Sequence, residues 1–72
     1  MGEIMAMMTL KAARINKGLG QKVAATEIGV SNKTLSNWEN GKTFPDVQQI
    51  EKICDVYGVT YNDLIFLPNN PL

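Results

Sequence analysis

The sequence predicts an all-α fold of five short helices. Three observations support this prediction. Apolar residues recur at helical spacing, without the alternating runs that mark strands and without a two-residue hairpin signal. Glycine follows four of the five helical segments, at the place where helices commonly end. At 72 residues, the chain has room for one domain at most.

The first two helices are predicted over about 9–16 and 21–27. Thr9 is a suitable N-cap for the first, because its hydroxyl can accept from a free backbone N–H. Gly29 follows the second, and glycine readily takes the positive φ angle of a tight helix end. The second helix also carries three apolar residues whose spacing predicts a common face: Val23, Ala24 and Ile28.

The third helix is predicted over about 32–40, with Ser31 as its N-cap and a glycine directly after it. Leu35 and Trp38 stand three residues apart, so they point the same way. For Trp38, an interior role is far more common than stacking on a base. We therefore expect this side of the helix to face the core.

The fourth helix is predicted over about 47–57 and the fifth over about 61–66. Asp46 and Thr60 are suitable N-caps for them. The fourth helix carries apolar residues at the spacing of a buried stripe: Val47, Ile50, Ile53, Cys54 and Tyr57.

The patterned region, 9–67, is the predicted domain, between a flexible N-terminal extension at 1–8 and a flexible tail at 68–72. The first eight residues are apolar, but they hold no Lys or Arg and are too short for a secretory signal. No stretch approaches the roughly 18 apolar residues that a membrane-spanning helix needs. We therefore expect a cytoplasmic protein with no membrane contact.

The residue inventory argues against an enzyme. There is no His, and Cys54 is the only Cys, so neither a disulfide within the chain nor a zinc site of the usual spacing is expected. No pair of a nucleophile and a base can be recognised, and no metal or cofactor is expected. Cys54 is expected to be an inert, buried thiol.

The net charge is zero, but the charges are unevenly distributed. Residues 9–43 carry six basic and two acidic side chains, and six minus two gives +4. Residues 44–72 carry one basic and four acidic side chains, which gives −3, and Glu3 contributes −1. One end can thus face phosphates while the other stays acidic. Many ordinary domains show such asymmetry, so it is weak support for nucleic-acid binding.

The second and third helices are joined by a tight turn at 28–31, which is the arrangement of a helix-turn-helix. The small Ala24 lets the two helices cross closely, and Val30 and Leu35 hold the third helix against the second. The third helix then stands out from the surface. Its exposed positions carry side chains that suit base edges and equally suit a solvated helix face: Asn32, Lys33, Ser36, Asn37 and Asn40.

Two runs carry a more specific signal, QKVAATEIGVS at 21–31 and TLSNWENGK at 34–42. Together they resemble the Cro/C1-type helix-turn-helix family, which includes lambdoid phage repressors and xenobiotic-response-element-type bacterial regulators. The resemblance covers about residues 10–66. It implies a five-helix, lambda-repressor-like DNA-binding domain and a transcriptional regulator that binds double-stranded operator DNA.

The resemblance also implies roles for individual residues. Gln21 would bind a phosphate with its amide at the start of the second helix, and could brace a base-reading side chain. The base-reading positions would be Asn32, Lys33 and Asn37, with Ser36 a lesser candidate; Lys33 would serve equally at a phosphate. The further phosphate-binding positions would be Thr34, Asn40 and Lys42.

Two departures from the family pattern bear on affinity. Gly20 replaces the usual Ser, Thr or Asn, which removes a side-chain phosphate contact. The third helix has no Arg, and Arg14 is the only Arg of the chain. We therefore expect modest phosphate affinity that depends on dimerisation.

Two further expectations follow from the resemblance. Arg14 and Glu39 are expected to pair, bracing the first helix against the end of the third, because a buried charge without its partner is costly. The last segment holds more apolar residues than the core needs. Some are expected to complete the core, and the rest to form a two-fold dimer contact: Ile65, Phe66 and Leu67.

The sequence thus predicts a repressor that binds an operator as a homodimer, with the third helix in the major groove, and blocks RNA polymerase at an overlapping promoter. Activation through contact with RNA polymerase stays open. Two alternatives also remain: an antitoxin-type regulator that also binds a toxin protein, and a protein-interaction module of the same fold without DNA binding. The neutral net charge and the single Arg favour the second alternative.

Overall fold

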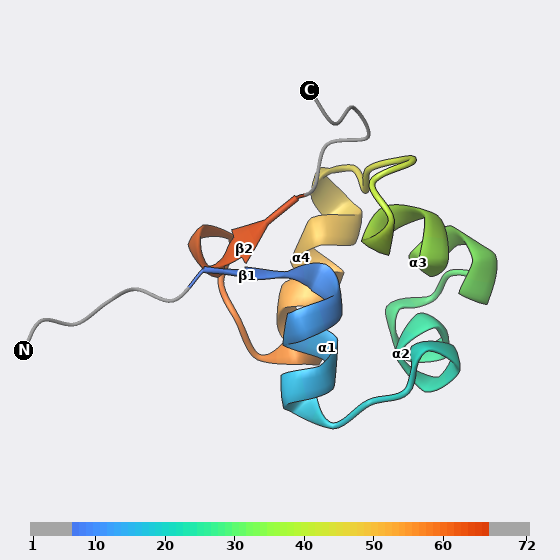
Figure 1. Cartoon of the computed structure of the whole chain (residues 1–72), viewed down its shortest axis with the longest axis horizontal. Helices are drawn as coiled ribbons and strands as arrows, with labels where there is room; N and C mark the ends of the chain where they lie inside the picture. Colours follow the sequence, from blue (N-terminus) through green and yellow to red (C-terminus); the bar gives the residue numbers. More distant parts are fainter. Residues whose placement is uncertain (1–6, 67–72) are drawn as a thin grey trace, which may run out of the picture.

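The computed structural model describes residues 7–66, and a helical bundle makes up most of this part (Figure 1). Its elements in chain order are β1 (Met8–Thr9), α1 (Leu10–Lys17), α2 (Gln21–Ile28), α3 (Asn32–Glu39), α4 (Val47–Tyr57), the 3-10 turn η1 (Tyr61–Asp63) and β2 (Leu64–Ile65). Most of the predicted N-terminal extension, Leu67 and the predicted tail at 68–72 lie outside the described residues.

The four α-helices begin and end close to where the sequence predicts. Thr9 caps α1 by accepting from the backbone N–H of Ala12 at 3.1 Å, and Ser31 caps α3 by accepting from that of Thr34 at 3.0 Å. Asp46 opens α4 with a reciprocal capping box. Gly29 ends α2 with a φ of 94°, in the left-handed region that glycine tolerates without strain. The predicted cap residues are therefore confirmed.

The core lies where the four helices meet. Leu35 and Ile53 are fully buried, and burying each such side chain stabilises the fold by roughly 1.5–3 kcal/mol. Small residues of α2 fill its closest contacts with α3 and α4, which lets the short helices approach. The buried apolar residues are Leu10, Ala13, Ala24, Ala25, Ile28, Leu35, Trp38, Ile53, Tyr57 and Leu64.

Two valines were expected on buried faces and are exposed instead. Val23 leaves 51% of its surface exposed, and the buried face of α2 uses Ala25 in its place. This helix packs against both α3 and α4, so adjacent small residues face its two neighbours. Val47 is 72% exposed, because it opens α4 and lies on a turn with little of the fold around it.

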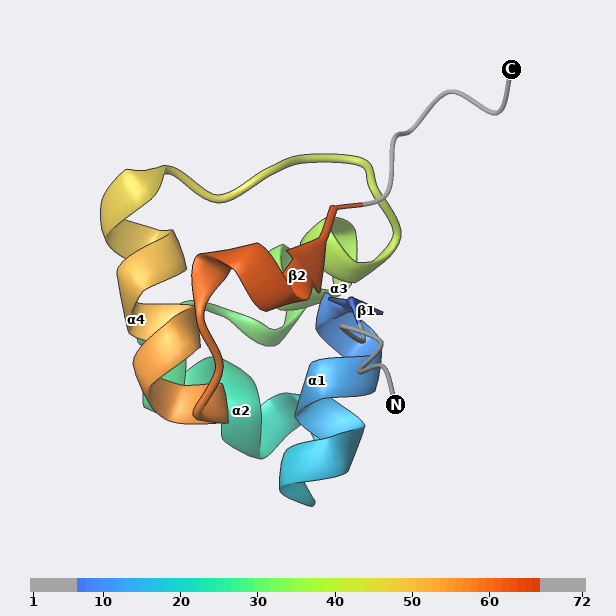
Figure 2. The same cartoon turned by 90° about the vertical axis from the view of Figure 1, so that its left-hand side faces the viewer.

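The predicted fifth helix is wrong. After Thr60, one 3-10 turn is closed by hydrogen bonds from the Thr60 backbone N–H and hydroxyl to the Asp63 carboxylate, at 2.9 and 3.1 Å. Leu64 is then extended and pairs in parallel with Met8. Figure 2 shows η1 and β2 crossing from α4 back towards β1. Pairing with a two-residue strand from the other end of the domain thus takes the place of a last helix, while the rest of the structure fits the predicted all-α fold.

Among the helices between Met7 and Phe66, none has the length and apolar content needed to cross a bilayer. Within residues 7–66, no three side chains of the types His, Cys, Asp and Glu come close enough together to hold a metal ion.

Candidate nucleic-acid interface

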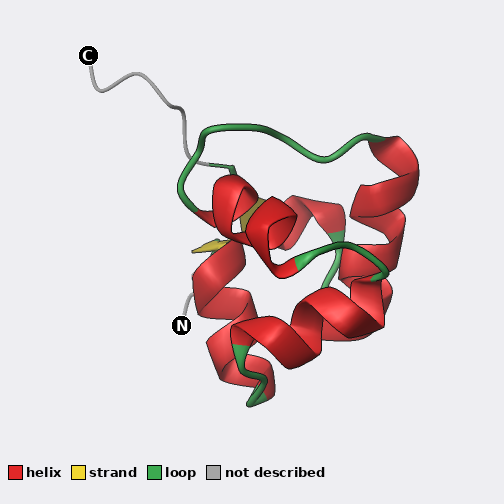
Figure 3. Ribbon diagram, turned by 90° about the vertical axis from the view of Figure 1, so that its right-hand side faces the viewer, coloured by secondary structure: helices red, strands yellow, loops and turns green. Residues whose placement is uncertain are grey.

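The unit formed by α2, the turn and α3 is held by backbone bonds and by a buried seam. The N–H groups of Gly29 and Val30 both donate to the carbonyl of Ala25, at 2.8 and 2.9 Å, and so reverse the chain. Leu35 and Trp38 then bury one side of α3. Figure 3 views the molecule from the side on which α2 and α3 lie. With one side of α3 anchored, its polar residues other than buried Glu39 are left on the outer side.

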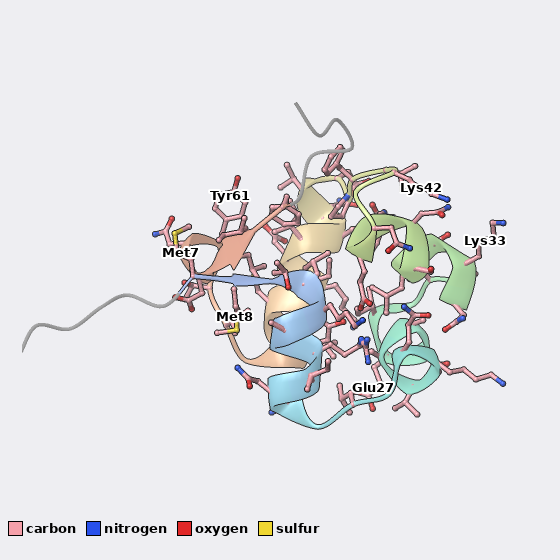
Figure 4. The ribbon with its side chains drawn as sticks, in the orientation of Figure 1. Met7, Met8, Glu27, Lys33, Lys42 and Tyr61 are labelled. Atoms are coloured by element: carbon pink, nitrogen blue, oxygen red, sulfur yellow. The ribbon has the colours of Figure 1, made fainter. Side chains whose placement is uncertain are left out.

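The predicted base-reading residues occupy this outer side to different degrees. Asn32 and Lys33 are exposed, whereas Ser36 and Asn37 are half-buried. Figure 4 shows the Lys33 amine extending away from the body of the protein. The hydrogen bonds found within residues 7–66 do not engage the side chains of Asn32, Lys33 or Asn37. Their donors and acceptors are thus available to a ligand.

The side chains of two predicted phosphate-binding residues also make hydrogen bonds within the protein. Thr34 accepts a hydrogen bond from the Ser31 hydroxyl at 3.0 Å, so it belongs to the N-terminal cap of α3. The Asn40 amide donates to the Ser36 hydroxyl at 3.4 Å, just after the end of the helix. These contacts tie both side chains to the frame of α3, and each retains further hydrogen-bonding capacity.

Lys42 is held beside α3 by the turn that follows the helix. Gly41 takes a φ of 76°, and the backbone N–H of Lys42 donates to the Asn37 carbonyl at 2.9 Å. The Lys42 side chain is exposed. Figure 4 shows the amines of Lys33 and Lys42 on the same side of the molecule, opposite Met7 and Tyr61. Two positive charges therefore flank the outer side of α3.

Gln21, at the start of α2, lies half-buried and is already bonded within the protein. Its amide nitrogen donates to the Glu39 carboxylate at 3.0 Å. The sequence reasoning missed this contact. The signal was present, because Gln21 opens one helix of the motif and Glu39 closes the other, but nothing in their spacing shows that these ends meet.

Arg14 and Glu39 form the predicted ion pair. The guanidinium donates from Nε to Oε2 at 2.7 Å and from Nη2 to Oε1 at 3.2 Å, and a third bond reaches the Leu19 carbonyl at 3.0 Å. Both residues are buried, at 8% exposure. The hydrogen bond to Glu39 raises the pKa of Arg14. The pair joins α1 to the end of α3, as expected.

Two other ionisable side chains lie near the core. Burial, with a smaller effect of Glu39, raises the pKa of Tyr57 to about 12, although Arg14 acts in the opposite direction. Its hydroxyl is buried and finds no hydrogen-bond partner among the described residues. Burial and then Asp55 raise the pKa of Cys54, so its thiol stays protonated at neutral pH.

The residues expected at a dimer contact lie at the other end of the molecule. Ile65 is 40% exposed, and half-buried Phe66 stacks on the Tyr61 ring with centroids 6.2 Å apart. Leu67 is outside the described residues. Met7 and Tyr61 are more than half exposed and add to the apolar surface there. We name β1, η1 and β2, with Met7 and Phe66, the chain-end sheet.

Comparison with known proteins places this architecture in a family. A family profile described as helix-turn-helix matches residues 10–64, which takes in all four helices and most of the chain. The chain belongs to this helix-turn-helix family. The resemblance drawn from the motif of α2 and α3 is thereby confirmed. No solved structure gives a significant match.

Curated relatives of this helix-turn-helix protein are regulators by name. Over 56 residues, which is 78% of this chain, it is 32% identical to the HTH-type transcriptional activator BcrR of Enterococcus faecalis and 36% identical to the HTH-type transcriptional regulator ImmR of Bacillus subtilis. It is 30% identical to the cryptic phage CTXphi transcriptional repressor RstR of Vibrio cholerae. The matches cover 28%, 44% and 50% of these relatives, so half or more of each lies outside the likeness.

Proposed function

We propose that this protein is a transcriptional repressor that binds operator DNA in a sequence-specific manner, as a homodimer, with α3 in the major groove. The observation that carries the proposal is the anchoring of α3. Leu35 and Trp38 bury its inner side completely or nearly so, while Asn32, Lys33 and Asn37 keep unengaged polar groups on its outer side. The family and the names of its relatives support the same function.

The chemistry of the outer side fits base reading. An Asn amide can bond to N6 and N7 of adenine together, and a Lys amine can reach O6 and N7 of guanine. Asn37 lies one turn beyond Lys33 and on the same side of the helix. We infer that Asn32, Lys33 and Asn37 read base edges, with Ser36 as a further contact.

The phosphate contacts would lie at both ends of the motif. Gln21 would bind the backbone at the start of α2, and Thr34, Asn40 and Lys42 would bind it along and after α3. Such contacts fix the position of the protein on the duplex but carry no base preference. Few of these residues are charged, so we propose that a single protomer binds DNA weakly and that dimerisation supplies the rest.

The dimer would join two copies through the apolar surface of the chain-end sheet. Exposed Ile65 and the stacked Phe66 support this assignment, and Leu67 is proposed to extend it. A two-fold pair would place its two α3 helices in successive major grooves, with half-sites roughly 34 Å apart. Its operator would then be a palindrome.

Repression would follow if the operator overlaps a promoter, because the bound dimer would block RNA polymerase. The relative named as an activator favours activation as a second candidate function. Activation would need contact between the bound protein and RNA polymerase. The two functions share one mode of DNA binding and differ in where the operator lies.

Selection of bound duplexes from random DNA tests the proposal. We expect a palindromic site to be enriched, with an affinity that falls steeply as salt increases. A folded protein that enriches no sequence and ignores duplex DNA even at low ionic strength would contradict the proposal and favour an interaction module. Purification of the protein from its host with a bound small protein would favour an antitoxin-type regulator.

A further inference from the structure

We propose that Glu39 is a positioning residue for DNA binding, whose carboxylate orients the Gln21 amide for its phosphate contact. This proposal rests on the proposed function, in which Gln21 binds the DNA backbone. The evidence is the hydrogen-bonded cluster of Arg14, Gln21 and Glu39. Oε1 of Glu39 accepts from the Gln21 amide nitrogen at 3.0 Å and from Nη2 of Arg14 at 3.2 Å, while Oε2 accepts from Nε of Arg14 at 2.7 Å.

The chemistry of the carboxylate decides which end of the amide it holds. Carboxylate oxygens paired with Arg14 can only accept hydrogen bonds, so Gln21 must turn its nitrogen, not its oxygen, towards Glu39. The amide nitrogen has two N–H groups, and one of them is used by this bond. The second N–H remains for an acceptor outside the protein, and a phosphate oxygen is such an acceptor.

Arg14 makes this arrangement compatible with DNA. A carboxylate next to the duplex would repel phosphates if its charge were unbalanced. Glu39 is buried and paired through two hydrogen bonds with Arg14, so its charge is offset at close range. The ion pair therefore allows an acidic residue to serve as a fixed acceptor beside a phosphate contact.

Fixing the amide also lowers the cost of binding. A free glutamine loses rotamer freedom when it binds, and that loss weakens affinity. Gln21 has already lost this freedom in the folded protein, because Glu39 holds its amide. Gln21 and Glu39 should therefore be coupled in DNA binding, whereas a purely structural role of Glu39 in the fold predicts independent effects.

A double-mutant cycle tests the coupling on the duplex enriched from random DNA. Replacing Arg14 and Glu39 together by Met keeps the buried volume and leaves no unpaired charge, so the fold is expected to survive. Dissociation constants are compared for the parent, Gln21→Ala, the Arg14→Met/Glu39→Met pair and the triple variant. Gln48→Ala, an exposed amide of α4 outside the proposed DNA and dimer contacts, is the matched control.

We expect Gln21→Ala to weaken binding about tenfold in the parent and less than about twofold in the double-Met background. Equal loss in both backgrounds, or no loss in the parent, would overturn the positioning role while leaving operator binding intact. A parent protein that binds no duplex would instead contradict the proposed function itself.

A measurement on the parent protein covers the case in which the double-Met variant does not fold. In ¹⁵N-labelled free protein, the Gln21 side-chain amide proton that faces Glu39 should resonate downfield of the corresponding proton of exposed Gln48, and the other Gln21 proton should move when operator is added. Gln21 side-chain protons that resonate where those of exposed Gln48 do, and that do not move when operator is added, would overturn the proposal. The side-chain amide protons of Gln48 should not move.

Discussion

The α2–α3 unit and the chain-end sheet present different surfaces. The first buries its apolar side chains except exposed Val23 and half-buried Val30, and presents polar groups from an anchored helix. The second leaves Met7, Tyr61 and Ile65 exposed and is built from strands that come from the two ends of the domain. One surface is suited to a polar duplex and the other to an apolar partner. In the proposed function, the first surface reads DNA and the second joins two copies of the protein.

The largest effect is expected from removing the Leu35 side chain, which anchors α3 in the core. Leu35 is fully buried, so Leu35→Ala should lower the free energy of unfolding by about 2–5 kcal/mol, through lost burial and the cavity left behind. Urea denaturation followed by circular dichroism measures the change. Ile65→Ala, on the chain-end sheet, should cost much less because Ile65 is 40% exposed. Equal losses would show that the two regions do not differ in packing.

The next test compares the two tyrosines of the chain, which are Tyr57, buried at the end of α4, and Tyr61, on the chain-end sheet. In the folded state the pKa of Tyr57 is about 12, above its ordinary value of 10.0. Between pH 10 and 12 the unfolded chain therefore loses the Tyr57 proton first. The free energy of unfolding should fall by up to about 2–3 kcal/mol as pH rises through this window.

Tyr57→Phe should remove this part of the decline, and stability near neutral pH should hold or improve because a buried, unpartnered hydroxyl is lost. Tyr61→Phe, at the exposed tyrosine, should retain the decline. Denaturant titrations at several pH values measure both. A parent and a Tyr57→Phe variant with the same pH profile would contradict the burial argument.

The third test removes the side chain of Asn37, which is half-buried on α3 and is proposed to read a base. Asn37→Ala should cost about 1–3 kcal/mol on the preferred operator and relax the preference at one base pair. Binding assays on the operator and its single-base variants measure the change. If Asn37→Ala and the parent bind every variant equally, Asn37 does not read DNA.

The smallest expected effect concerns phosphate contact. Lys42→Ala should weaken binding to all sequences alike. It should also reduce the salt slope, which is the steepness with which the logarithm of the binding constant falls with the logarithm of salt concentration, by about one. Lys52→Ala, an exposed lysine of α4 outside the proposed interface, is the control and should leave the slope unchanged. A Lys42→Ala variant with altered base preference but the parent slope would place Lys42 at a base edge.

Local signals predicted the α2–α3 unit well. Its caps and glycine turns depend on residues a few positions apart, and Ser31 and Gly29 show them directly in the sequence. The Arg14–Glu39 pair was predicted only through the family resemblance, because 25 positions separate the two residues. The contact of Gln21 with Glu39 was missed for the same reason.

The chain-end sheet was mispredicted because its structure depends on distant pairing. Leu64 and Ile65 carry apolar side chains that suit a helix or a strand, and only the register with Met8 and Thr9 decides between them. Val47 was misplaced for another reason. Its spacing fits the buried stripe of α4, but a residue on the first turn extends beyond the core that the stripe faces.

A titration of ¹⁵N-labelled protein with a duplex carrying a single half-site tests the proposed roles of the two surfaces most directly, because one protomer then binds without dimerisation. The largest changes in backbone and side-chain signals should fall on Gln21, on Asn32 to Asn37 and on Lys42, with little change at Tyr61 and Ile65. Changes concentrated at Tyr61 and Ile65, or none at low ionic strength, would contradict the assignment of α3 as the helix that reads DNA.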